Sequence, residues 1–332
     1  MRVVLTKNSS KKYTKYLVLL IVPFLPLIFR NNSYLMMLFC FAEIYIIATT
    51  GLDVLYGYSG QISFATSAFF GIGAYGSVLL HKYFSIPVVF TILMAAVIGC
   101  IVALLFAYPV SKLRFAFLSL STISFNYVIY QIITRSPGGI TGDFNGIFTD
   151  KINLFGVSLK DYETYFYFGL ICVVVMVALK MLLVRSRVGR AMLAIKQNLH
   201  AAEGMGIDTR KYKVYAFGVY GFYAALAGAL YAHLVGFISP ETFAETQSTL
   251  FLIMAMFGGL CSDWGPVIGG LCIVFLTDLL SYLEQYQLLI YGILLILFIA
   301  FLPGGVVGEG KKLVTYLKPL KGKKEAAADV KG

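Results

Sequence analysis

Long apolar runs recur along almost the whole chain, and they restrict its fold more than any other feature. A helix needs about 20 mostly apolar residues to cross a lipid bilayer, and about ten stretches of the sequence approach that length. They cover residues 16–29, 33–50, 61–80, 86–110, 115–134, 165–184, 214–237, 248–260, 267–283 and 288–302. The run 248–260 is too short to cross unaided and fits a re-entrant segment. The sequence therefore predicts an all-α, polytopic membrane protein with about 8 to 10 transmembrane helices.

The composition excludes a water-soluble globule. Hydrophobic residues make up 59% of the 332 residues and charged residues only 13%, which leaves too few polar side chains to cover a soluble surface. The formal net charge of +11 does not indicate nucleic-acid binding, because the basic residues lie in the gaps between apolar runs and not on one face of a soluble fold. Membrane lipid is therefore an expected partner, and nucleic acid is not.

Basic residues also predict the orientation of the chain. Most of the 27 Lys and Arg residues lie in 1–15, 185–213 and 304–332, and cytoplasmic segments of membrane proteins carry an excess of such residues. We predict a cytoplasmic N-terminal segment at 1–15, a transmembrane domain at 16–303 and a basic cytoplasmic tail at 304–332, in the bacterial inner membrane. Both termini are then cytoplasmic. Two long connections lie on opposite sides, 135–164 in the periplasm and 185–213 in the cytoplasm.

The sequence contains no recognisable catalytic or metal-binding motif. The five cysteines lack CxxC spacing and the three histidines stand apart. Residues 305–311 match the start of a phosphate-binding loop, but Lys312 replaces the hydroxyl residue that would hold Mg²⁺, and the segment follows an apolar helix. We therefore expect no catalytic residue, no metal site and no cofactor bound by this chain. Any ATP and Mg²⁺ would be bound by partner subunits.

The third apolar run is rich in glycine, hydroxyl and amide side chains, which indicates close packing or a polar cavity. Ser63, Ser67 and Gly71 recur every four residues and would form one stripe of small residues on a helix. A backbone broken at membrane depth is tolerated only within protein or beside water. Two interpretations remain open, namely ordinary helix packing and a translocation path. The candidate path residues are Gly57, Gln61, Ser63, Thr66 and Ser67.

The inside connection 185–213 has a pattern of its own. An apolar stripe of helical spacing runs through it, formed by Met192, Ile195, Leu199 and Ala202. Gly204 and Gly206 then end the predicted helix and make a compact knob with small residues at its tip. Such a knob can seat in a groove on another protein and move as a rigid lever. The alternative is an amphipathic helix lying on lipid headgroups.

The outside connection 135–164 contains a cluster of turn-forming residues. Their exposed amide groups could order against a docked protein, or they could belong to an ordinary surface loop. The candidate docking residues are Gly138, Gly139, Thr141 and Gly142.

Glu43 and Asp278 are carboxylates within apolar runs, where an ionised group costs several kcal/mol and usually faces a cavity or a partner. They raise the alternative of an ion-coupled secondary transporter, in which both would be coupling groups. They could also be hydrogen-bonded packing residues, and a membrane scaffold without transport activity is a further alternative.

Four motifs follow one another along the chain. They are Gly51-Leu52-Asp53 with 57–63 and 69–75; 139–142; 189–195 with 201–207; and 258–260 with 265–269, closed by Leu302-Pro303-Gly304-Gly305. Each motif alone is weak, but the four in this order resemble the LivM-type permeases of the branched-chain amino acid ABC transporters. The resemblance covers most of the chain, from about Gly51 to Gly308.

The resemblance implies an ABC importer permease fold and a heteromeric importer. This chain would pair with a LivH-type permease, two ATPase subunits would bind on the cytoplasmic side, and a periplasmic or lipid-anchored substrate-binding protein would deliver the substrate. The resemblance also implies that the segment 201–207 couples to the ATPase. The residues so implicated are Arg190, Ala201, Ala202, Glu203, Gly204, Met205 and Gly206.

The substrate implied by the resemblance is leucine, isoleucine or valine. Two segments depart from the family pattern: Phe64-Ala65-Thr66 stands where Leu-Gly-His is usual, and Cys261-Ser262-Asp263 stands where small residues are usual. Related permeases carry urea, short amides or other amino acids. An ABC permease of this family for urea or short amides is therefore another alternative.

Overall fold

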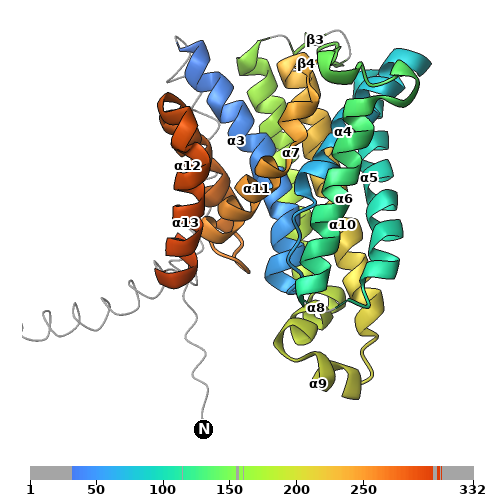
Figure 1. Ribbon diagram of the computed structural model, residues 1–332, viewed down its shortest axis with the longest axis vertical. Helices are drawn as coiled ribbons and strands as arrows, with labels where there is room; N and C mark the ends of the chain where they lie inside the picture. The colour runs from blue at the N-terminus through green and yellow to red at the C-terminus, as the bar shows by residue number, and fades with distance from the viewer. Residues whose placement is uncertain are drawn as a thin grey trace, which may run out of the picture.

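The computed structural model describes residues 32–113, 115–154, 157–159, 161–301, 305–306 and 308. The predicted segments 1–15 and 16–29 lie outside the described residues, as does the tail beyond residue 308. The described part of the chain is a bundle of α-helices (Figure 1).

The helices follow most of the predicted apolar runs within a few residues. α3 covers Ser33–Leu52 and continues directly into a π-helix, η2, at Asp53–Tyr58. The other long helices are α4 (Thr66–Phe84), α5 (Val88–Val110), α6 (Phe115–Arg135), α7 (Tyr162–Arg185), α10 (Thr209–Val235), α11 (Glu245–Gly258), α12 (Gly265–Leu280) and α13 (Gln287–Phe301). Short 3-10 turns lie at Pro137–Gly139, Asp143–Asn145, Pro240–Phe243 and Ser281–Tyr286.

Among the described residues, six helical segments are long and apolar enough to cross a membrane. They are Ser33–Tyr58, Val88–Val110, Ala116–Arg135, Tyr162–Arg185, Thr209–Val235 and Gly265–Leu283. α11 has 14 residues, too few to cross unaided, as its apolar run indicated. The structure agrees with a polytopic membrane protein, whereas the predicted count of 8 to 10 transmembrane helices is not confirmed.

α10 is buried along most of its length and packs against α3, α4 and α5. Glycines make these contacts close. A Cβ added at Gly73 of α4 would lie 1.9 Å from the carbonyl oxygen of Ala225, and one added at Gly228 of α10 would lie 1.8 Å from the carbonyl oxygen of Phe70. The backbones of α4 and α10 therefore touch, as small residues allow when helices associate in lipid.

The bundle has two distinct ends (Figure 1). At one end, which we call the strand end, β1 (Ile147–Phe148) pairs antiparallel with β4 (Phe237–Ile238), and β2 (Asn153–Leu154) pairs with β3 (Val157–Ser158). These short strands are a small departure from the all-α prediction. At the other end, α8 (Arg187–Gln197) and α9 (Leu199–Gly204) project as a lobe, which with the turn up to Gly206 we call the α8–α9 lobe.

The start of the third predicted helix was wrong. The apolar run 61–80 does not begin as a helix, because residues 60–65 form an irregular segment between η2 and α4. Gly60 has a φ of +73°, and the amide of Ala65 bonds to the hydroxyl oxygen of Ser63 at 3.2 Å. Ser63 therefore precedes α4, and the predicted stripe of Ser63, Ser67 and Gly71 is not a single helix face. The physical reason is competition, since hydroxyl side chains bond to nearby backbone groups in place of helical partners.

Candidate translocation path and coupling elements

The break between η2 and α4 lies beside a buried group of neutral polar side chains. We call this group the hydroxyl cluster. It consists of Ser63, Thr66, Ser67, Thr122, Asn126, Tyr220 and Ser248, from the broken segment, α4, α6, α10 and α11. Each member is at most 1% exposed, so the cluster is closed to solvent in this conformation.

Hydrogen bonds join the hydroxyl cluster across five parts of the chain. The hydroxyl of Tyr220 lies 2.8 Å from that of Thr66 and 3.3 Å from that of Ser63. Ser67 donates its backbone N–H to the hydroxyl of Ser248 at 2.9 Å, and its own hydroxyl donates to Asn126 at 2.9 Å. Thr66 and Ser67 are buried, so α4 begins inside the bundle, whereas α11 begins with the exposed Glu245 and Thr246 and reaches the cluster at Ser248.

Aromatic rings pack against one side of the hydroxyl cluster. The ring of Phe69 lies edge-on to that of Tyr220, with centroids 5.4 Å apart, and 5.3 Å from the ring of Phe125. The hydroxyl cluster contains no charged side chain, and it places hydroxyl and amide groups beside apolar rings. Such a site can exchange hydrogen bonds with an overall neutral polar solute that also carries an apolar part.

Only part of the predicted path is brought together. Ser63, Thr66 and Ser67 belong to the hydroxyl cluster, whereas Gln61 turns away and donates to the hydroxyl of Ser59 at 2.6 Å and to the carbonyl of Lys213 at 3.2 Å. Gly57 lies in η2 and belongs to a second network described below. The predicted set omitted Thr122, Asn126, Tyr220 and Ser248, which lie on other helices. Other polar residues stand near Thr122, Asn126 and Ser248 in the sequence, so no local pattern distinguished them.

Ser248→Ala is expected to lower the free energy of unfolding by about 1–3 kcal/mol, because the buried N–H and hydroxyl of Ser67 would lose a partner. Ser121→Ala is the matched control. Its hydroxyl bonds only within its own helix, to the carbonyl of Phe117 at 2.8 Å, and a change below about 0.5 kcal/mol is expected. Denaturant-induced unfolding of the purified chain in detergent measures both values. Equal losses in the two variants would contradict the structural role of the cluster.

A buried ion pair joins η2 to α7. The ammonium group of Lys180 lies 2.6 Å from a carboxylate oxygen of Asp53, and each side chain is 1% exposed. The loop between α11 and α12 completes the arrangement, since Cys261 donates its N–H to Asp53 at 2.9 Å and the carbonyl of Ser262 accepts from Lys180 at 2.9 Å. The sequence analysis did not identify this pair. The sequence did contain an indication of the pair: Lys180 lies within one apolar run and Asp53 just after another. Charged residues buried at such positions require a partner of opposite charge.

Gly57 lies at the contact between η2 and the same loop. A Cβ at this position would lie 2.2 Å from Asp53 Oδ1 and 3.0 Å from the amide nitrogen of Cys261. The carbonyl of Gly57 accepts from the thiol of Cys261 at 2.7 Å and from the ammonium group of Lys196, on α8, at 2.6 Å. η2 is therefore joined both to α7 and to the α8–α9 lobe.

The α8–α9 lobe differs from the single predicted helix. Asn198 has φ −157° and ψ 109° and caps α9 by accepting the N–H of Ala201 at 3.1 Å, so the predicted stripe is divided between two helices. The helix does reach Gly204. Met192, Ile195 and Ala202 are nevertheless buried, in a lobe whose α8 packs against α9 and also against α7 and α10.

The predicted coupling residues lie on this lobe. Met205 is 84% exposed, and an added Cβ at Gly204 or Gly206 would meet nothing within 4 Å. Glu203 is exposed and accepts from the hydroxyl of Thr209 at 3.0 Å. The remaining predicted residues are Arg190 and Ala201, which are exposed, and Ala202, which is buried.

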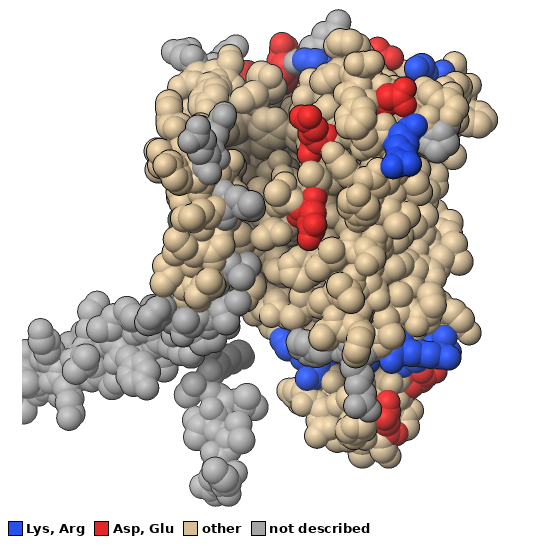
Figure 2. All heavy atoms as spheres, viewed as in Figure 1, with Lys and Arg blue, Asp and Glu red and all other residues tan. Residues whose placement is uncertain are grey.

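Figure 2 shows a band of Lys and Arg side chains where the bundle meets the lobe. Exposed basic residues at these helix ends are Lys112, Arg185, Arg187, Arg190, Lys196 and Lys211. Basic side chains at the ends of apolar helices reach toward headgroups and water. The lobe tip extends beyond this band.

At the strand end, the predicted docking residues have two different roles. Gly138 and Gly139 are exposed, with φ of +78° and +71°. Thr141 is buried and holds the turn, since its hydroxyl donates to the carbonyl of Ile133 at 2.7 Å and its N–H donates to the hydroxyl of Ser136. A Cβ on Gly142 would lie 2.4 Å from the carbonyl oxygen of Gly146. Of the four predicted residues, Gly138 and Gly139 are the exposed ones, and the N–H of Gly139 donates to the carbonyl of Ser136 at 2.7 Å.

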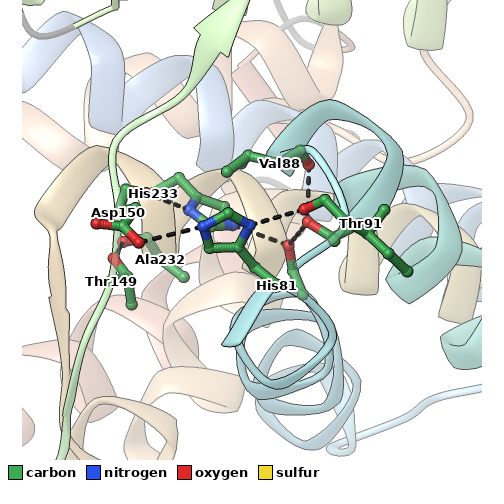
Figure 3. Close-up of polar contacts among 9 residues, drawn as sticks. His81, Val88, Thr91, Thr149, Asp150, Ala232 and His233 are labelled. Carbon is green, nitrogen blue, oxygen red and sulfur yellow. Dashed lines mark hydrogen bonds and ion pairs between the residues drawn. The ribbon is translucent and has the colours of Figure 1, made fainter. Parts of the chain in front are cut away.

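Two histidines hold the later part of the same connection (Figure 3). His233 of α10 lies 2.7 Å from the carbonyl of Asp150 through Nδ1 and 2.8 Å from the hydroxyl of Ser77 through Nε2. His81 of α4 lies 3.1 Å from the carboxylate of Asp150. The hydroxyl of Thr149 donates to the carbonyl of Ala232 at 2.7 Å. Residues 149–150 are therefore bound to α4 and α10.

Glu43 and Asp278 do not form one site. Asp278 accepts a hydrogen bond from the hydroxyl of Tyr34, whereas Glu43 is 5% exposed and faces Gly169 of α7. Tyr34 and Glu43 are separated by about 13 Å along α3. Among the described residues, no group of three or more His, Cys, Asp or Glu side chains is placed to hold a metal ion.

Comparison with known proteins identifies the family. Residues 34–299 match the family described as branched-chain amino acid transport system / permease component. The high-affinity branched-chain amino acid transport system permease protein LivM of Escherichia coli K12 is 28% identical over 288 residues, covering 80% of this chain and 68% of the relative. The corresponding LivH of the same organism is 26% identical over 285 residues, covering 80% and 91%.

An archaeal protein is also similar. The probable branched-chain amino acid transport permease protein LivM of Methanocaldococcus jannaschii is 24% identical over 322 residues, covering 82% of this chain and 92% of the relative. No solved structure matches the chain. The family match covers most of the apolar helices described above. The chain is thus a multi-pass membrane permease that belongs to the family of branched-chain amino acid transport system permease components.

Proposed function

We propose that this chain is the LivM-type permease subunit of an ATP-driven ABC importer in the bacterial inner membrane, and that it moves branched-chain or related amino acids. The observation that carries the proposal is the closed hydroxyl cluster at the break between η2 and α4, connected through η2 to an exposed lobe at one end of the bundle. A polar site inside the bundle can bind a solute, and an exposed lobe can contact a partner protein.

The α8–α9 lobe is the proposed contact with the ATPase subunits, which hydrolyse ATP with Mg²⁺ outside this chain. Its exposed Glu203 and Met205 lie at the end of α9, and the lobe extends beyond the basic band (Figure 2). An excess of basic residues marks the cytoplasmic side of a membrane protein, which supports a cytoplasmic lobe and a periplasmic strand end. Gly138 and Gly139 would then face the substrate-binding protein.

A LivH-type permease is the proposed second membrane subunit, since relatives named LivM and LivH both resemble the chain.

The chemistry of the cluster supports an amino acid with an apolar side chain. Hydroxyl and amide groups offer hydrogen bonds, and Phe69 and Phe125 offer apolar surface beside them. Urea or a short amide would use the polar groups and leave the rings without a contact. Uptake of labelled leucine in the presence of unlabelled valine, isoleucine, urea or acetamide distinguishes these substrates. Valine and isoleucine are expected to inhibit the uptake, and urea and acetamide are not.

The double variant Glu203→Arg, Met205→Trp is expected to lower leucine uptake by about tenfold or more, because a few central residues of a protein contact each contribute about 2 kcal/mol or more. Uptake is measured in cells that carry the ATPase and binding-protein genes, with the amount of chain in the membrane determined in parallel. Tyr282→Trp is the matched control, since Tyr282 is 90% exposed on η6 (Ser281–Tyr286), away from the lobe.

Unchanged uptake in the double variant would contradict the coupling role of the lobe. Deletion of both ATPase genes is expected to abolish uptake through this chain. Uptake that survives this deletion and stops when a protonophore is added would overturn the ATP-driven proposal.

A further inference from the structure

Lys196 links the α8–α9 lobe directly to η2. Its ammonium group donates to the carbonyl of Gly57 at 2.6 Å and lies 3.4 Å from the thiol of Cys261. Lys196 lies in the last turn of α8, and Gly57 lies in the last turn of η2. The contact therefore joins the ends of two helices that are far apart in the sequence.

The carbonyl of Gly57 takes its donors from side chains, namely the thiol of Cys261 and the ammonium group of Lys196. η2 ends at Tyr58, and carbonyls in the last turn of a helix have no helical partner. The amides that follow bond elsewhere, those of Ser59, Gly60 and Gln61 going to the carbonyls of Val54, Tyr56 and Leu55. A cation at a helix C-terminus is also favoured by the helix dipole, so an ammonium group suits this position.

The aliphatic part of Lys196 also contacts the broken segment. A Cβ added at Gly60 would lie 3.1 Å from Lys196 Cγ, and Gly60 has a φ of +73°. Glycine at position 60 thus allows both the turn and the close approach of the lysine. Lys196 covers Gly60 with its methylene chain and holds Gly57 with its charge.

The other side of η2 is held by the buried pair. Asp53 bonds to Lys180 and to the amide of Cys261, which fixes the start of η2 against α7 and the loop between α11 and α12. The end of η2 is bound to α8, and Ser63 of the hydroxyl cluster follows a few residues later. Displacement of α8 relative to α7 would therefore act on residues 57–63, between the fixed start of η2 and the cluster.

We propose that Lys196 is a positioning residue that transmits displacement of α8 to residues 57–63 and so to the hydroxyl cluster. This inference rests on the proposed function, because it needs a partner that moves the lobe. A lysine that only stabilised the fold would affect uptake and ATP hydrolysis alike. A transmitting lysine affects uptake while the ATPase subunits continue to hydrolyse ATP.

The test uses the complete transporter, with both permeases, the ATPase subunits and the binding protein, in proteoliposomes with labelled leucine. Lys196→Met retains the methylene chain over Gly60 and removes the donor, and uptake is expected to fall about tenfold, which corresponds to one charge-assisted hydrogen bond. ATP hydrolysis per assembled complex is expected to stay within about twofold of the parent value. Lys196→Arg restores a charged donor and is expected to recover most of the uptake.

Lys211→Met is the matched control. Lys211 is an exposed lysine near the start of α10, at the same end of the bundle, and its ammonium group lies over the ring of Tyr215. Uptake and ATP hydrolysis are expected to match the parent. If Lys196→Met fails to assemble, Lys196→Gln replaces it, because the shorter side chain cannot span the distance to Gly57.

Three results overturn the inference: unchanged uptake in Lys196→Met, a proportional fall of uptake and ATP hydrolysis, or no recovery in Lys196→Arg. A parent complex that shows no ATP-dependent leucine uptake would overturn the proposed function itself. The two failures are therefore distinguishable.

Discussion

Lys180→Met is expected to lower the free energy of unfolding of this chain by about 3–5 kcal/mol, the usual cost of leaving one partner of a buried ion pair uncompensated. Asp53 is 1% exposed and its carboxylate lies 2.6 Å from the lysine ammonium group. Removing the lysine leaves the carboxylate with the amide of Cys261 at 2.9 Å, and it also removes the donor to the carbonyl of Ser262. Unfolding of the purified chain in mixed detergent micelles by added dodecyl sulfate measures the change.

The double variant Asp53→Asn, Lys180→Met is the control. It removes both charges, so most of the lost stability is expected to return, because paired replacement of a buried ion pair is often close to neutral. Arg187→Met tests whether any basic residue near this end has the same effect, and a change below about 0.5 kcal/mol is expected for this exposed side chain. A double variant as unstable as Lys180→Met would show that the charge of Asp53 is not the cause.

Gly228→Leu is expected to destabilise the folded chain by about 3 kcal/mol, at the upper end of the usual cost of overpacking. The added Cβ alone would lie 1.8 Å from the carbonyl oxygen of Phe70. This neighbour is backbone in the second turn of α4 and cannot rotate away. α4 and α10 would have to separate, which also disturbs Thr66 and Tyr220 in the hydroxyl cluster.

Gly76→Ala, on α4, is the control. A Cβ at position 76 would lie 3.6 Å from that of Ala95, which is ordinary contact, so alanine is expected to be neutral or slightly stabilising through its higher helix propensity. The amount of folded chain in the membrane and its unfolding in dodecyl sulfate measure both variants. A Gly228→Leu chain as stable as Gly76→Ala would contradict the close crossing of α4 and α10.

The loop between α11 and α12 shows why one departure from the family pattern is compatible with the fold. Cys261-Ser262-Asp263 stands where small residues are usual. The structure uses the N–H of Cys261 and the carbonyl of Ser262 to hold Asp53 and Lys180, and every non-proline residue supplies these groups. The side chains of this loop can therefore vary while the buried pair keeps its partners.

The positions of the long helices were predicted well because apolar length is a local property of the chain. α3, α5, α6 and α7 begin and end within a few residues of their predicted runs. The sequence also indicated that 248–260 is too short to cross, and α11 has 14 residues. The predicted helix start at residue 61 was wrong because Ile62, Phe64 and Ala65 continue the apolar run. Bonds such as those of Phe64 to Thr122 and of Ala65 to Ser63 support the irregular backbone instead.

The sequence by itself determined that this chain belongs in a membrane, which stretches are helical, and which family it belongs to, because hydrophobic length and ordered motifs require no knowledge of contacts. The tertiary structure decided which polar residues meet. Asp53 and Lys180, or Ser67 and Ser248, are far apart in the sequence, and their pairing depends on how helices cross. At membrane depth a buried polar group needs a hydrogen-bond partner, and where that partner lies on another helix, only the fold specifies it.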